Sequence, residues 1–131
     1  MTPPHALVTG ASSGIGAAIA REYARRGVPL VLTARRADRL EALAATLRAQ
    51  VQVTCIAADL ADPAAPAFLQ AELAHQGIAV GHLVNNAGYG VPGRFLSAGW
   101  QTHADFLQVM VTAVGELTHL YLPAMEAAGH G

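Results

Sequence analysis

A glycine-rich turn between a short apolar run and a helical pattern constrains the fold more than any other feature of the sequence. The turn spans residues 9–16 and reads TGASSGIG. Apolar residues 6–8 precede it, and Ile15, Ile19 and Tyr23 follow it at the spacing of an α-helix. A strand, a glycine turn and a helix in this order predict the first β-α unit of a nucleotide-binding α/β fold.

The glycines of this turn have distinct expected roles. Gly10 permits the tight turn, Gly14 lets the backbone approach a phosphate, and Gly16 lets the helix pack close to the sheet. A diphosphate placed there meets backbone N–H groups and the positive end of the helix dipole. We therefore predict a dinucleotide site, in preference to a purely structural turn or another phosphate ligand. Its expected residues are Gly10, Ser12, Ser13, Gly14, Ile15 and Gly16.

Strand and helix patterns alternate four times along the chain. Strands are expected at 6–8, 30–32, 51–57 and 83–84, and helices at 15–26, 40–47, 62–77 and 102–128. This alternation is typical of a doubly wound parallel α/β sheet. A length of 131 residues suits one domain, so we expect a single domain over residues 1–131.

The last predicted helix is apolar on nearly every side between Phe106 and Leu122. A helix without a clear polar face is usually buried on both sides. The four strands and three preceding helices cannot cover it entirely, so either more of the same chain or another subunit is expected there. We predict a homo-oligomer formed through this helix.

The end of the second predicted strand indicates which dinucleotide binds. It reads Thr33-Ala34-Arg35-Arg36, with no carboxylate before Asp38. An NAD site usually has an acidic residue here, whereas an NADP site has an arginine for the 2′-phosphate. Two arginines at a helix N-terminus are unfavourable unless an anion lies between them. We predict NADP(H) rather than NAD(H), held by Arg35 and Arg36; the alternative is a solvated surface pair.

Two further strand ends carry candidate site residues. Asp59-Leu60 follows the third strand, and Asp59 is expected either to accept a hydrogen bond from the adenine amino group or to cap the next helix. Both interpretations stay open. Asn85-Asn86-Ala87-Gly88 follows the fourth strand, where asparagine and glycine favour a turn.

Taken in order, the glycine turn, Arg35, Asp59-Leu60 and the Asn-Asn-Ala-Gly segment resemble the classical short-chain dehydrogenase/reductase family, in its NADP(H)-preferring form. The resemblance implies a Rossmann-type sheet with strand order 3-2-1-4, continued by three more strands in full-length members. It also implies that Asn86 steadies the central strands while Ala87 and Gly88 line the ribose and nicotinamide. The implied reaction interconverts a small-molecule carbonyl and an alcohol by hydride transfer.

The chain departs from the family pattern in two ways. Met110 occupies the position of the family's helical asparagine, counted back from Pro123. The sequence contains no lysine, so the family's Tyr-x-x-x-Lys pair does not occur in it. The pair matters because a neighbouring ammonium lowers the tyrosine pKa enough for proton exchange at neutral pH.

We therefore predict no catalytic residues in this chain, and we expect the cofactor-binding half of a truncated enzyme, inactive by itself and without the C-terminal strands. The alternative is a non-catalytic nucleotide-binding or scaffolding module acting through its apolar last helix.

Composition argues against several other classes. The net charge is −1 and the eight basic residues are scattered, so neither a nucleic-acid surface nor a polybasic membrane patch is predicted. The six histidines lack metal-ligand spacing, so no metal site is expected. No signal peptide or membrane span is visible, and Cys55 reads as a small core residue in a reducing compartment. We expect a cytoplasmic location.

Overall fold

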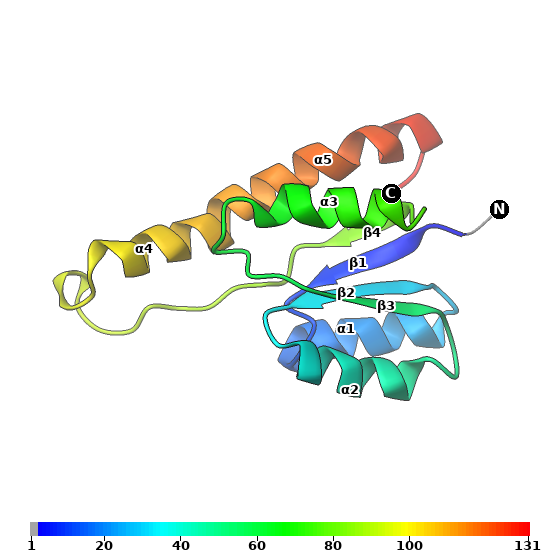
Figure 1. Cartoon of the computed structure of the whole chain (residues 1–131), viewed down its shortest axis with the longest axis horizontal. Helices are drawn as coiled ribbons and strands as arrows, with labels where there is room; N and C mark the ends of the chain where they lie inside the picture. Colours follow the sequence, from blue (N-terminus) through cyan, green and yellow to red (C-terminus); the bar gives the residue numbers. More distant parts are fainter. Residues whose placement is uncertain (1–2) are drawn as a thin grey trace.

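The computed structural model describes residues 3–131 as a parallel sheet with helices on both faces (Figure 1). The strands are β1 (His5–Thr9), β2 (Leu30–Ala34), β3 (Val53–Ala57) and β4 (Val80–Val84). The helices are α1 (Gly14–Arg25), α2 (Ala37–Leu47), α3 (Ala65–His75), α4 (Trp100–Leu107) and α5 (Ala113–Ala128). A 3₁₀ turn at Phe95–Ser97 precedes α4, and a π-helical segment at Gln108–Thr112 joins α4 to α5.

The strand order is β3-β2-β1-β4, and every pairing is parallel. The predicted order 3-2-1-4 is therefore confirmed. The chain moves outward from β1 through β2 to β3 and then returns to the other side of β1. Figure 1 shows α1 and α2 on one face, with α3 and α5 on the other. The reversal beside β1 opens a crevice at the carboxyl ends of the strands, where ligands of such sheets bind.

Two hydrophobic clusters hold the layers together, one on each face of the sheet. Ala6 and Val8 of β1 pack with α1 and α2, whereas Leu7 between them packs with α3 and α5. Successive side chains of a strand point to opposite faces. Because both faces are covered, β1 is buried along its whole length, and its three central residues are apolar.

The first helix is confirmed, but its buried face differs from the Ile15-Ile19-Tyr23 pattern. The buried face consists of the small residues Gly16, Ala17, Ala20 and Ala24. Ile15 is 73% exposed. Small side chains let a helix lie close to the sheet, so the larger residues are displaced to the flank of the contact.

The last helix is continuous through its π-helical segment, and one of its faces is buried. Val109, Ala113, Leu117 and Tyr121 recur every four residues and enter the second core cluster. Val111, on another face, is 62% exposed. Within the described part of the chain, the preceding strands and helices therefore leave one face of this helix uncovered, in line with the expectation that they could not cover it entirely. No helix in residues 3–131 is apolar over a sufficient length to cross a bilayer.

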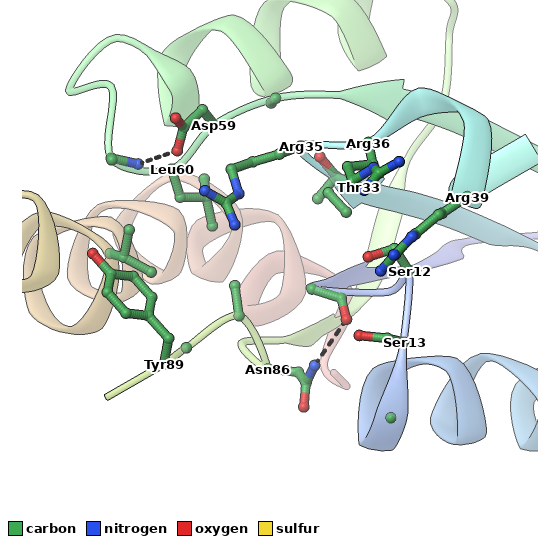
Figure 2. A pocket seen from close by; sticks show the side chains of 18 of the residues that line it. Ser12, Ser13, Thr33, Arg35, Arg36, Arg39, Asp59, Leu60, Asn86 and Tyr89 are labelled. Atoms are coloured by element: carbon green, nitrogen blue, oxygen red, sulfur yellow. Dashed lines mark hydrogen bonds between the residues drawn. The ribbon is translucent and has the colours of Figure 1, made fainter. Parts of the chain in front are cut away.

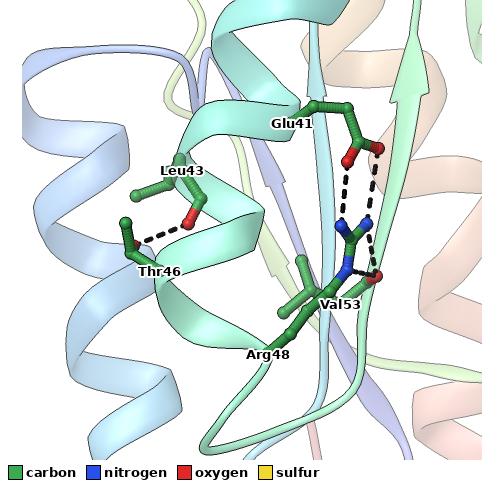
Figure 3. Close-up of polar contacts among 5 residues, drawn as sticks. All are labelled: Glu41, Leu43, Thr46, Arg48 and Val53. Atoms are coloured by element: carbon green, nitrogen blue, oxygen red, sulfur yellow. Dashed lines mark hydrogen bonds and ion pairs between the residues drawn. The ribbon is translucent and has the colours of Figure 1, made fainter.

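The outer edge of β3 is covered by a side chain from the α2-β3 connection (Figure 3). The guanidinium of Arg48 donates to the Val53 carbonyl oxygen at 3.4 Å and pairs with Glu41 at 2.8 Å. An unpaired edge carbonyl is a template for pairing with another chain, and a charged side chain blocks this.

Cys55 lies on the same strand, partly buried against the first core cluster, and burial raises the pKa of its thiol to about 11.

His5 gives the fold an expected sensitivity to acid. Its side chain is fully buried, and neither ring nitrogen has a hydrogen-bond partner within residues 3–131. Burial lowers the pKa of His5 below 6.5, so the unfolded state binds more protons once the pH falls through that value. The contribution of neutral His5 to the free energy of unfolding is complete above this pH and declines below it.

Equilibrium denaturation between pH 7 and pH 5 tests this expectation. The free energy of unfolding should fall less steeply with decreasing pH in His5→Leu than in the wild type. His75→Leu, at an exposed position, is the control and should leave the pH dependence of the free energy of unfolding unchanged.

Candidate functional site

A cavity of about 580 Å³ lies at the carboxyl edge of the sheet (Figure 2). The loops after all four strands contribute to it, together with the first turn of α2 and the helix that follows the last loop. The structure brings most of the predicted site residues together there. Those that line the cavity are Gly10, Ser12, Ser13, Gly14, Ile15, Arg35, Arg36, Asp59, Leu60, Asn86, Ala87 and Gly88.

The glycine turn leaves the beginning of α1 open toward the cavity. Gly10 and Gly14 have φ angles of +61° and +57°, in the left-handed region that favours glycine. A Cβ on Gly14 would meet no atom within 4 Å, so this side of the turn is open. Ser13 is the N-cap residue, but its side chain makes no capping hydrogen bond, and the first turn of α1 contains no acidic residue. The first backbone N–H groups of α1 are therefore available to an anion.

Gly16 is the one predicted residue that does not line the cavity. A Cβ at this position would collide with the Gly10 carbonyl oxygen and the Asn86 carboxamide. Because Gly16 has no Cβ, α1 can begin directly against the turn and the loop after β4. The sequence predicted a close approach to the sheet, and the structure shows that the nearest neighbours belong to these two loops.

The loop after β4 is joined to the end of β1 by a compact set of hydrogen bonds. The Asn86 carboxamide donates to the carbonyl oxygens of Thr9 and Gly10 at 3.1 and 3.2 Å. The Thr9 hydroxyl accepts the backbone N–H groups of Asn86 and Ala87 at 3.0 and 2.9 Å. The steadying of the central strands by Asn86, implied by the family resemblance, is visible in these contacts.

Asp59 stabilises a turn and does not cap α3. Its Oδ1 atom accepts the Ala61 N–H at 3.0 Å, and Asp62 makes the same type of bond to Ala64 at 2.9 Å. Helix α3 begins only at Ala65, so the helix-cap interpretation of Asp59 is wrong. Two successive turns separate β3 from α3, and they place both Asp59 and Leu60 on the cavity wall.

The three arginines near the start of α2 differ in their partners. Arg35 and Arg36 are exposed and line the cavity, as does Arg39 one turn further along the chain. Arg36 pairs with Asp38 at 3.3 Å, and this guanidinium holds the pKa of Asp38 below its usual value. Within the part of the chain that the structure describes, Arg35 and Arg39 make no ion pair.

Sequence reasoning missed several residues of the cavity. Arg39 was detectable, since it lies in the first turn of the helix that follows Arg35 and Arg36. Tyr89 lies in the last loop, and its ring meets that of Phe106 edge-on at 5.7 Å. Four others adjoin predicted residues at the ends of β2 and β3, whereas long-range packing brings Asp105 and Val109 to the cavity. The missed residues are Thr33, Ala34, Arg39, Ala58, Ala61, Tyr89, Asp105 and Val109.

Met110, at the position of the family's helical asparagine, lies in the π-helical segment against the loop after β4. A Cβ on Gly88 would lie 2.9 Å from its sulfur atom. Such segments are rare and are often found at functional sites.

No group of three or more potential metal ligands occurs within residues 3–131.

The junction around Asn86 predicts a large effect of one substitution on stability. Asn86→Ala should lower the free energy of unfolding by about 1–3 kcal/mol, because two backbone carbonyls lose their donor at a partly buried site. Asn85→Ala is the matched control, since Asn85 bonds only to the Thr118 hydroxyl at an exposed position, and should cost less than about 0.5 kcal/mol. Urea denaturation measures both; equal losses would contradict the junction's importance.

Comparison with known proteins agrees with this arrangement. Over 129 residues the chain is 37% identical to a sulfoacetaldehyde reductase of Chromohalobacter salexigens, covering 95% of this chain and 50% of that protein. A short-chain dehydrogenase from Sphingobium yanoikuyae, solved in complex with NADPH, superimposes with a TM-score of 0.89 at 40% identity, covering 98% of this chain and 50% of that one. The bulky-bulky ketone specific alcohol dehydrogenase from Comamonas testosteroni gives a TM-score of 0.90 at 36% identity, covering 100% and 53%.

The chain thus spans about half the length of the relatives that it matches. A family model for short chain dehydrogenases matches residues 4–131, which is nearly the whole sequence. With the parallel 3-2-1-4 sheet and the glycine turn at its carboxyl edge, this match shows that the chain belongs to the short-chain dehydrogenase/reductase family.

Proposed function

We propose that this chain binds NADP(H) in the cavity at the carboxyl edge of its sheet. The observation that carries the proposal is the uncapped N-terminus of α1, which opens toward the cavity beside two unpaired arginines. A diphosphate satisfies free N–H groups at such a helix end. The Sphingobium yanoikuyae enzyme, solved with NADPH, supports this choice of ligand.

The cavity walls suit the separate parts of such a cofactor. The glycine turn, with Ser12 and Ser13, binds the diphosphate and the adenosine ribose. Arg35 holds the 2′-phosphate, because a guanidinium fork matches phosphate geometry. The sequence also predicted Arg36 at this phosphate, but its guanidinium is already paired with Asp38. Asp59 and Leu60 receive the adenine. Asn86, Ala87 and Gly88 border the nicotinamide side.

We infer that the parent activity interconverts a carbonyl and an alcohol, in line with the reductase and alcohol dehydrogenase among the relatives. The bound cofactor supplies or accepts the hydride. Residues 1–131 bind and orient it through their backbone and arginines. They contain no lysine, and therefore no Tyr-x-x-x-Lys pair to exchange the proton. We propose that these residues alone are inactive.

The exposed face of the last helix supports a further proposal, that the chain self-associates there. Leu107, Met110, Val111 and Leu122 are between 39% and 62% exposed. Large apolar side chains exposed along one helix are typical of interaction sites. β4 is an edge strand of the sheet, so its outer backbone groups are open as well.

The cofactor proposal predicts a preference measurable by titration. NADPH should bind more tightly than NADH, by about tenfold or more, because a charge-assisted contact to the 2′-phosphate is worth about 1.5–3 kcal/mol. Arg35→Asp should reverse the ratio by repelling the phosphate and accepting the ribose hydroxyls of NADH. Isothermal titration calorimetry with both cofactors measures this, and equal wild-type affinities would refute the preference.

The association proposal predicts a concentration-dependent mass in light scattering. Val111→Arg, on the exposed face of the last helix, should shift the protein toward monomer. Gln50→Arg, at an exposed position in the α2-β3 connection, is the control and should leave the mass unchanged. A monomeric wild-type protein across the concentration range would contradict the proposal.

A further inference from the structure

One of the three cavity arginines already has an anionic partner in its own helix. Arg36 is the N-cap residue of α2, and its Nη2 atom lies 3.3 Å from Asp38 Oδ2. Asp38 is the acidic residue in the first turn of α2. The charge of Arg36 is therefore compensated locally, and binding a phosphate through it would require breaking this pair or sharing the guanidinium.

Arg35 and Arg39 differ from Arg36 in this respect. Both line the cavity, and neither guanidinium takes part in a hydrogen bond or an ion pair within residues 3–131. Figure 2 shows Arg35 extending into the cavity from the end of β2, and Arg39 from α2 on the side of Ser12. Two unpaired cations at the positive end of a helix dipole repel one another and the helix end. An anion between them would remove that cost.

The end of β2, two residues before Arg35, contains a polar atom without a partner. Thr33 is 1% exposed, and its Oγ1 atom has no hydrogen-bond partner within the described residues. It nevertheless lines the same cavity. Buried hydroxyl groups are normally hydrogen-bonded, so this one points to a ligand or a ligand-bound water at this end of the cavity.

The acidic residues of the cavity do not compete for these arginines. Asp59 accepts the Ala61 N–H, and Asp105 accepts the side-chain amide of Gln101 at 2.7 Å. Neither carboxylate pairs with an arginine within the described chain. The cationic groups of the α2 end therefore remain available to an incoming anion.

We propose that Arg39, rather than Arg36, is the second guanidinium that binds the 2′-phosphate together with Arg35. The inference rests on the proposed function and assigns a specificity residue within it. Arg35 and Arg39 approach from successive elements and clamp the phosphate from two sides. Arg36 stays with Asp38 and stabilises the first turn of α2.

The test compares two ligands that differ only in this phosphate, 2′,5′-ADP and 5′-AMP, by isothermal titration calorimetry. Arg39→Gln should weaken 2′,5′-ADP about tenfold or more and change 5′-AMP less than about twofold. Arg36→Gln is the matched control at a neighbouring exposed position and should change both ligands less than about twofold. Arg39→Lys should lie in between, because it keeps the charge but loses the fork. Circular dichroism melts verify that each variant is folded.

Each other outcome has a defined meaning. A loss of 2′,5′-ADP affinity in Arg36→Gln but not in Arg39→Gln would overturn the inference. Equal weakening of both ligands in Arg39→Gln would also overturn it, because that result indicates a structural role. If Arg35→Asp loses NADPH while Arg39→Gln does not, this inference fails and the proposed function stands. If the wild-type protein binds neither NADPH nor NADH, the proposed function itself fails.

Discussion

The hydrogen bonds between Asn86 and the end of β1 are the contacts on which the rest of the site depends. The glycine turn and the loop after β4 belong to segments more than 70 residues apart in sequence. The Asn86 carboxamide donates to two consecutive carbonyl groups, those of Thr9 and Gly10. The Thr9 hydroxyl in turn accepts the backbone N–H groups of Asn86 and Ala87 in the loop. The loop is thereby held where Ala87 approaches Gly10 closely. A side chain on Gly10 or Gly16 would separate these segments.

This junction also determines what α1 can bind. Because Gly16 brings the start of the helix against the turn, the free N–H groups of the first turn face a defined cavity and not bulk solvent. The small residues of the buried face keep α1 close to β1 and β2. On the side of the glycine turn, the wall of the site is held by these hydrogen bonds and close contacts. Its opposite wall is built by side chains from α2 and from the loop after β3, and under the proposed function these side chains distinguish NADP(H) from NAD(H).

The two edges of the sheet differ in how far they are protected against pairing with another chain. At β3, the guanidinium of Arg48 covers an outward carbonyl and is itself held by Glu41. The β4 edge lies beside a helix whose outer face exposes Leu107, Val111 and Leu122. Charge protects the first edge against association, whereas the second combines open backbone groups with apolar surface. The β4 edge and the neighbouring helix face are therefore the side of the molecule open to the proposed self-association.

Local sequence chemistry determined the alternating elements, the left-handed glycines at positions 10 and 14 and the cluster of arginines after β2. These features depend on neighbours within a few residues, so they were predictable. The family resemblance added the strand order. Only tertiary structure decided that Asp59 supports a turn before α3, that Asp105, Val109 and Tyr89 reach the cavity, and that the last helix buries one face here. It also decided which of the three cavity arginines is paired within its own helix, because that depends on side-chain geometry across a helix end and not on residue type. Packing between distant segments sets these contacts, and a linear pattern of residue types does not encode such distances.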